Sequence, residues 1–141
     1  MMSAILVVPA ELVGELREGV CGELHRCCEA LSEVIEAPQS PNDPERYAEC
    51  RADLAIKWRL LDLVGWEDSK EAQVDLVEYG ALVLTALCNQ LEDAEHNLAY
   101  LLTTTDTDAA KRDATAQRMK RLRAFVCTLK CVGSFAERDD V

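Results

Sequence analysis

The segment PAELVGELREGVCGELHRCCEALSEVIE, residues 9–36, decides the fold class. Its apolar residues recur at steps of three and four, which places them on one face of an α-helix. This stripe comprises Leu12, Leu16, Val20, Leu24, Cys27, Leu31 and Ile35. Pro9 suits the first turn of a helix, where the N–H that proline lacks would have no partner. The pattern predicts one continuous amphipathic helix over about residues 9–36.

The prolines of residues 38–44 prevent this helix from continuing, because proline cannot donate the helical hydrogen bond. Asp43 before Pro44 is typical of a new helix start. We expect this second helix over about residues 44–64, with Trp58 in its apolar stripe and therefore in the core. Gly65 then provides a left-handed cap, which glycine adopts without steric cost.

A third amphipathic helix is predicted over about residues 69–103, starting at a capping-box-like pair, Asp68 and Glu71. It is unusually long, and it could bend at Gly80 or Asn97. A polar turn separates it from a fourth helix over about residues 107–132. The stripe of this last helix comprises Met119, Leu122, Val126 and Leu129, and Gly133 and Ser134 are expected to end it.

Short loops between long amphipathic helices make sequential helices antiparallel neighbours. The chain has 141 residues, which corresponds to a single domain. Aromatic residues are only 5% of the chain, so its core must consist mainly of Leu, Val and Ala. The sequence therefore predicts an all-α fold, an antiparallel up-down four-helix bundle that occupies residues 1–141.

A short N-terminal segment before the first helix has β-forming character. Ile5, Val7 and Val8 favour a strand or an extended arm. A lone strand has no partner inside an all-α chain, so we expect it to pair with the same segment of a second copy.

The chain is acidic, with a formal net charge of −11. Residues 109–136 hold seven basic side chains and one acidic side chain. This segment has a net charge of +6, so the rest of the chain has a net charge of −17. Such a balance argues against whole-molecule binding to nucleic acid or to anionic membranes. The apolar run at residues 4–8 is too short for a signal peptide, and we expect a cytoplasmic protein with reduced cysteines.

The first hint of chemistry is a set of cysteine and histidine residues. Cys21, His25 and Cys28 share one helical face at i, i+4 and i+7, and Cys127 and Cys131 form a second pair. Thiolate and imidazole ligands would suit Zn or Cu(I). The plainer interpretation is that these cysteines fill small gaps in the core or at an interface.

The second hint is the basic character of the fourth helix, where four basic residues project beside the apolar stripe: Arg112, Lys120, Arg123 and Lys130. They could form an anion or nucleic-acid surface. The simpler interpretation is that they pair with the acidic helices across the rim of the bundle, which helps to select neighbouring helices.

Enzyme classes find little support. Di-metal bundles need paired Glu-x-x-His motifs, and Asp93 with His96 has no counterpart at His25, which Gly22 precedes by three residues. A Cys–His pair on one helix lacks an orienting third group. Nucleotide-binding and nucleophile-elbow motifs are absent from the sequence.

These observations predict a non-enzymatic protein-interaction or structural module without a cofactor, which self-associates as a homodimer or binds another protein. Metal binding through the cysteine and histidine face is the alternative, and nucleic-acid or anion binding is a weaker one. Trp66 could pack against the preceding helix end or anchor a partner. The candidate interaction residues are Ile5, Val7, Val8, Val13 and Trp66.

Overall fold

The computed structural model describes residues 4–36, 43–65, 70–104 and 108–139, with the side chains of the last helix described through Cys131. Its elements, in chain order, are β1 (Ile5–Val8), α1 (Ala10–Glu36), α2 (Asp43–Val64), β2 (Ala72–Asp75), α3 (Leu76–Thr103) and α4 (Ala109–Asp139). Helices dominate the described residues, so the predicted all-α class with four helices is confirmed.

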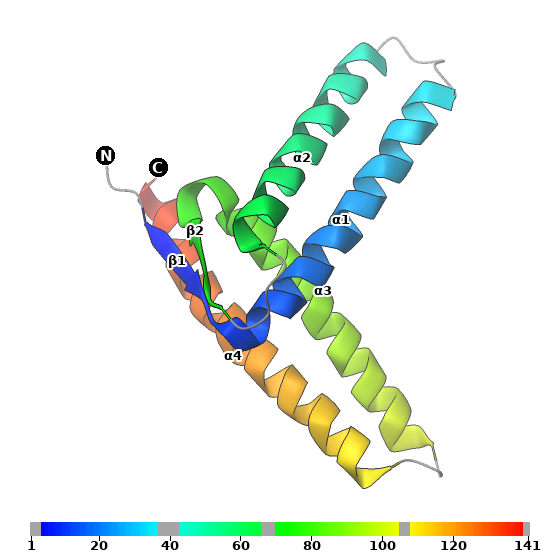
Figure 1. The fold of residues 1–141 in the computed structure, drawn as a ribbon, viewed down its shortest axis with the longest axis vertical. Coiled ribbons are helices and arrows are strands. Elements are labelled where there is room, and N and C mark those ends of the chain that lie inside the picture. The colour runs from blue at the N-terminus through cyan, green and yellow to red at the C-terminus, as the bar shows by residue number, and fades with distance from the viewer. Residues whose placement is uncertain (1–3, 37–42, 66–69, 105–107, 140–141) are drawn as a thin grey trace.

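The helices form two antiparallel hairpins, α1–α2 and α3–α4, that share a base and diverge from it (Figure 1). Packing is most extensive within each hairpin and between α1 and α3, which cross near the base. These contacts agree with the predicted helical bundle. The divergence leaves the outer part of each hairpin with only two helices to pack against one another (Figure 1).

The core lies at the crossing, where every helix contributes one fully buried leucine. These are Leu16 of α1, Leu60 of α2, Leu87 of α3 and Leu122 of α4. Burying one such side chain contributes roughly 2 kcal/mol from apolar surface removed from water. Fully buried valines from α1, α3 and both strands fill the space between them: Val8, Val13, Val20, Val74 and Val83.

The N-terminal strand has a partner within its own chain, so the expected pairing with a second copy is wrong. β1 pairs with β2 in antiparallel register, from Ile5 opposite Asp75 to Val8 opposite Ala72. Val8, Ala72 and Val74 are buried on the inner face of this two-stranded sheet, which packs over the base of the hairpins. A backbone hydrogen bond of 2.8 Å from Leu76 N to Ala4 O extends the contact.

The predicted start of the third helix is wrong, because β2 occupies the residues before it. The helix begins at Leu76 and not near residue 69. The carboxylate of Asp75 accepts a hydrogen bond from the backbone N–H of Val77 at 2.9 Å, so Asp75 is the N-cap. Asp68 of the expected capping box lies outside the described residues. The helix then runs unbroken through both of its predicted bend positions.

Of the predicted C-terminal ends of α2 and α4, the first is confirmed and the second is wrong. Gly65 has φ of 73° and donates its N–H to Leu61 O at 2.9 Å, which confirms the left-handed cap after α2. The predicted end of α4 is wrong, since the helix continues past Gly133 and Ser134 to Asp139. A glycine inside a helix costs only about 1 kcal/mol relative to alanine, which a long helix tolerates.

The expected burial of Trp58 is also wrong, because 53% of this residue is exposed. The buried residues of α2 are Leu60, Leu61 and Val64, all near its C-terminal end. Beyond them α2 packs on α1, and the upper part of this hairpin stands clear of the other helices (Figure 1). No further helix covers Trp58 within the part of the chain that the structure describes.

Candidate interaction surface

Some of the predicted interaction residues are exposed in the structure and others are buried. Ile5 and Val7 are exposed on the outer face of the sheet. Val8 and Val13 are fully buried in the core of their own chain, so they cannot form an interaction surface, and that part of the prediction is wrong. Their apolar character reflects packing at the helix crossing. Trp66 lies outside the described residues.

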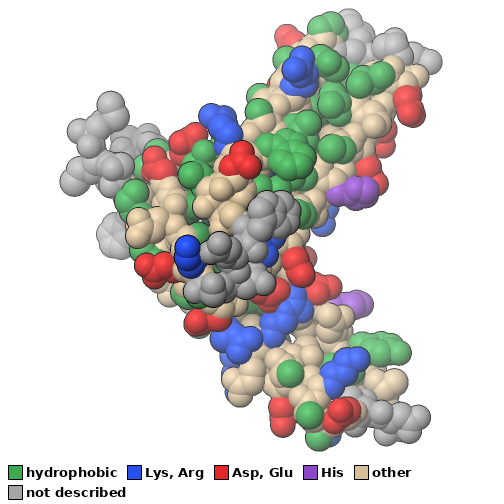
Figure 2. Space-filling view, in the orientation of Figure 1, with side chains coloured by type: hydrophobic (Ala, Val, Ile, Leu, Met, Phe, Trp, Pro, Cys, Tyr) green, Lys and Arg blue, Asp and Glu red, His purple; other side chains and the backbone are tan. Residues whose placement is uncertain are grey.

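A different apolar surface lies on the outward side of α2. Its members are all exposed and recur along the helix over about three turns: Tyr47, Ala48, Ala52, Ala55 and Trp58. We call these five residues the α2 outer face. Tyr47 is 39% exposed, and Figure 2 shows hydrophobic side chains gathered over the upper hairpin. The guanidinium of Arg51 lies 5.8 Å from the centre of the Tyr47 ring, within cation–π range.

The charge of α2 differs from that of its neighbour. α2 carries five acidic and four basic side chains, whereas α1 carries seven acidic and two basic ones. Four of the five acids of α2 lie in its first half, and the second half contains Lys57 and Arg59 with one acid, Asp62. The α2 outer face is therefore carried by a nearly neutral helix in a strongly acidic protein.

The predicted metal ligands do not gather around a common point. Cys21, Cys28, Cys127 and Cys131 are exposed, and His25 Nε2 lies 3.0 Å from Glu29 Oε1 on the surface of α1. Over the described ranges, no three His, Cys, Asp or Glu side chains are arranged to hold a metal ion. For these four cysteines the expectation that they fill gaps in the core is wrong, because their side chains are exposed.

The basic residues predicted on the fourth helix lie largely at the surface. Lys120, Arg123 and Lys130 are exposed and Arg112 is half-buried. Arg123 Nη2 lies 3.5 Å from Glu95 Oε1 of α3, so one of these charges pairs across the hairpin. This contact favours the interpretation in which the basic helix selects an acidic neighbour.

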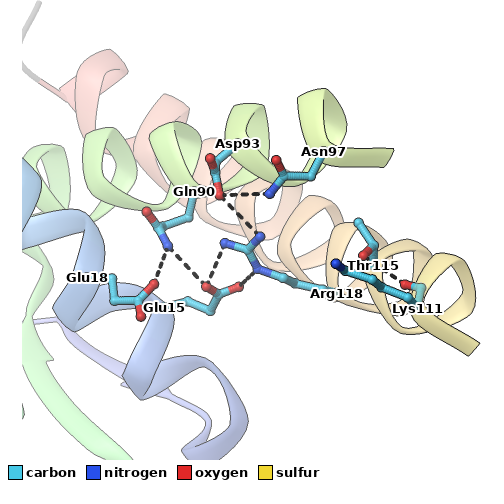
Figure 3. Close-up of polar contacts among 8 residues, drawn as sticks. All are labelled: Glu15, Glu18, Gln90, Asp93, Asn97, Lys111, Thr115 and Arg118. Atoms are coloured by element: carbon cyan, nitrogen blue, oxygen red, sulfur yellow. Dashed lines mark hydrogen bonds and ion pairs between the residues drawn. The ribbon is translucent and has the colours of Figure 1, made fainter. Parts of the chain in front are cut away.

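Sequence reasoning missed a polar cluster that joins three helices, shown in Figure 3. Arg118 of α4 donates two hydrogen bonds to the carboxylate of Glu15 of α1, with Nη2 to Oε1 at 2.9 Å. Its Nη1 also lies 3.3 Å from Asp93 Oδ2 of α3, and Gln90 Nε2 donates to Glu15 Oε1 at 3.1 Å. The hydrogen bond to Glu15 raises the pKa of Arg118 and so keeps it charged.

An open hollow of about 600 Å³ lies beside this cluster, lined by Glu11, Glu18 and Arg121 among others. Glu15 and Arg118 are already bonded to each other, and both are mostly buried. Neither residue offers a nucleophile or a free base to the hollow. We interpret the cluster as a clamp between α1, α3 and α4. Its two main residues are 103 positions apart, so local sequence carries no signal for it.

Comparisons with known proteins identify no relative of this chain. No protein-family model matches the chain, and neither the curated proteins nor the solved structures contain a match. None of the helices, as far as they are described, combines the length and apolar character required to cross a membrane.

Proposed function

We propose that the protein is a non-enzymatic interaction module that forms a homodimer through the α2 outer face. The observation that carries this proposal is the half-exposed Trp58, which lies one helical turn from the exposed Ala55 on α2. Tryptophan is enriched at the energetic centres of protein interfaces. Burying its exposed surface and that of Tyr47 would supply a substantial part of the association energy.

The distribution of charge supports a second copy of the chain as the partner that binds the α2 outer face. Two molecules of net charge −11 repel each other, and this repulsion is weakest where the surface is nearly neutral, as it is along α2. A two-fold, antiparallel pairing of α2 helices would set the acidic first half of each against the exposed Arg59 of the other. The small side chains of Ala52 and Ala55 would allow the two helices to approach closely.

A cytoplasmic location belongs to the same proposal. All seven cysteines are free, and four of them are exposed. Free surface thiols suit a reducing compartment, where they remain reduced. The interaction also requires no cofactor.

The test is the oligomeric state of the full chain, measured by sedimentation equilibrium at high micromolar concentration. We expect the wild type to be a dimer and Trp58→Glu to be a monomer, because a buried, unpaired carboxylate opposes association. Tyr100→Glu is the matched control, since Tyr100 is 65% exposed on α3, outside the α2 outer face. Circular dichroism confirms that each variant is folded.

A monomeric wild type would refute self-association. A Trp58→Glu variant that dimerises as well as the wild type would refute the choice of surface. The metal and nucleic-acid alternatives have less support. The described cysteine and histidine side chains form no ligand group, and Arg123 is paired within the chain.

A further inference from the structure

One cysteine of the seven has an amine beside its sulfur. Lys57 Nζ of α2 donates a hydrogen bond to Cys27 Sγ of α1 at 2.9 Å. Both residues are half-buried between the two helices, 30 positions apart in the chain. Among the residues that the structure describes, Lys57 has no other hydrogen-bond or ion-pair partner. An ammonium group whose acceptor is a sulfur atom is an uncommon arrangement, since sulfur is a weak acceptor.

The chemistry of these two groups is complementary once the sulfur is oxidised. A cysteine sulfenic acid has an electrophilic sulfur, which condenses with a nearby thiol or nitrogen. A lysine amine is a nucleophile when it is deprotonated. The neighbouring Cys28 is exposed, so its sulfenic acid would face solvent.

We propose that Cys27 and Lys57 form a covalent sulfur–nitrogen link when the protein meets hydrogen peroxide. In the first step the Cys27 thiol attacks peroxide, the O–O bond breaks, and the products are a sulfenic acid and water. The sulfur loses two electrons and the peroxide gains them. In the second step Lys57 Nζ releases a proton to solvent and attacks the sulfur. The S–N bond forms, the S–O bond breaks, and the oxygen leaves as water.

The link would have two structural effects. It would fasten α2 to α1 in the hairpin, where these two helices pack mainly on each other. It would also remove the positive charge of Lys57 from the second half of α2. The geometry that supports the link is internal to one chain, so this inference does not rest on the proposed dimer.

The experiment is peptide mass spectrometry of the full-length Cys28→Ser protein after treatment with hydrogen peroxide. This background excludes a disulfide between Cys27 and its sequence neighbour. Trypsin cannot cleave after a lysine whose amine is modified. We therefore expect fragment 27–46 joined to fragment 52–59, with cleavage lost at Lys57. The joined species should be about 2 Da lighter than the sum of the two fragments, which corresponds to the loss of two hydrogens.

Lys57→Arg in the same background is the matched control. It keeps the positive charge but offers no comparable nucleophile. We expect the joined species to vanish and Cys27 to progress to sulfinic acid, with folding checked by circular dichroism. Finding oxidised Cys27 beside an unmodified, cleavable Lys57 would overturn the proposal. So would a joined species that persists in the Lys57→Arg protein.

Discussion

Gly19 of α1 lies against the backbone of Ala86 of α3, at the point where the two hairpins cross. A Cβ atom placed on Gly19 would lie 2.8 Å from both the carbonyl carbon and the Cβ of Ala86, closer than real Cβ atoms approach other atoms. Both residues are buried. The crossing therefore depends on glycine because it has no side chain, and not because of an unusual backbone angle.

Replacing Gly19 with alanine should destabilise the protein. The added methyl group meets the Ala86 backbone, which cannot move aside as a flexible side chain would. We expect the free energy of unfolding to fall by about 2 kcal/mol, typical of overpacking and net of the better helix propensity of alanine. Urea denaturation monitored by circular dichroism measures this change.

Gly22 provides the control for this substitution. It lies one turn further along the same helix, and a Cβ there would meet nothing within 4 Å. Gly22→Ala should raise the free energy of unfolding by up to about 1 kcal/mol through helix propensity alone. Equal effects of the two substitutions would show that the close crossing is not formed.

Arg118 should stabilise the contact between α1, α3 and α4, and another cation at this position should replace it only in part. Arg118→Lys keeps the charge but cannot donate two parallel hydrogen bonds to Glu15. We expect Arg118→Ala to lower the free energy of unfolding by about 2 kcal/mol and Arg118→Lys to recover only part of this loss. A double-mutant cycle with Glu15→Gln measures the coupling directly. A coupling near zero would contradict the proposed role.

Truncation should destabilise the protein at Val13 and have little effect at Val7, although both are candidates for an interaction surface. Val13 is fully buried, so Val13→Ala should lower the free energy of unfolding by about 2 kcal/mol. Val7 is exposed opposite Gln73, so Val7→Ala should change it by less than about 0.5 kcal/mol. Thermal and urea denaturation at one protein concentration distinguish the two outcomes. Similar losses at both positions would contradict the difference in burial between Val13 and Val7.

Tyr79 should make the free energy of unfolding depend on pH in the alkaline range. Burial, and then the neighbouring Glu78 carboxylate, raise the pKa of the Tyr79 phenol above its ordinary value of 10.0. The unfolded chain thus loses this proton at a lower pH than the folded chain. The contribution of Tyr79 to the free energy of unfolding is therefore intact below about pH 10 and falls as the pH rises toward the folded-state pKa.

Tyr79→Phe isolates this effect, because lysines also titrate in the alkaline range. We expect the free energy of unfolding of Tyr79→Phe to fall less steeply than that of the wild type above about pH 10. Urea denaturation in a series of alkaline buffers measures both slopes. Parallel curves would show that Tyr79 ionises equally in both states.

The helices could be predicted from sequence because periodicity is local, and the residues around Leu16 or Leu122 report which face is apolar. Periodicity does not report whether another helix covers that face. Trp58 shares a stripe with Leu61, yet Leu61 is buried in the core and Trp58 is 53% exposed. The exposed α2 outer face was therefore missed, although the stripe that contains it was recognised.

Other features were missed because they depend on distant partners. The segment at residues 72–75 is only four residues long and continues the apolar spacing of α3, so nothing local distinguishes it from a helix start. Its partner, β1, is separated from it in the sequence by the whole α1–α2 hairpin. The contact between Arg118 and Glu15 likewise requires three helices to be in place. A one-dimensional pattern specifies neither the crossing of α1 with α3 nor the pairs that this crossing brings together.

The sheet that joins the two ends of the α1–α2 hairpin has a consequence for the order of folding. Helices form within about a microsecond, whereas pairing Val8 with Ala72 requires a long loop to close first. Two strands of four residues are too short to hold together alone, so they depend on the crossing at Gly19. We therefore expect the strands to dock late and to detach early. Native-state hydrogen exchange should show the amide of Leu76, which bonds to Ala4, opening more readily than the amides around Leu87.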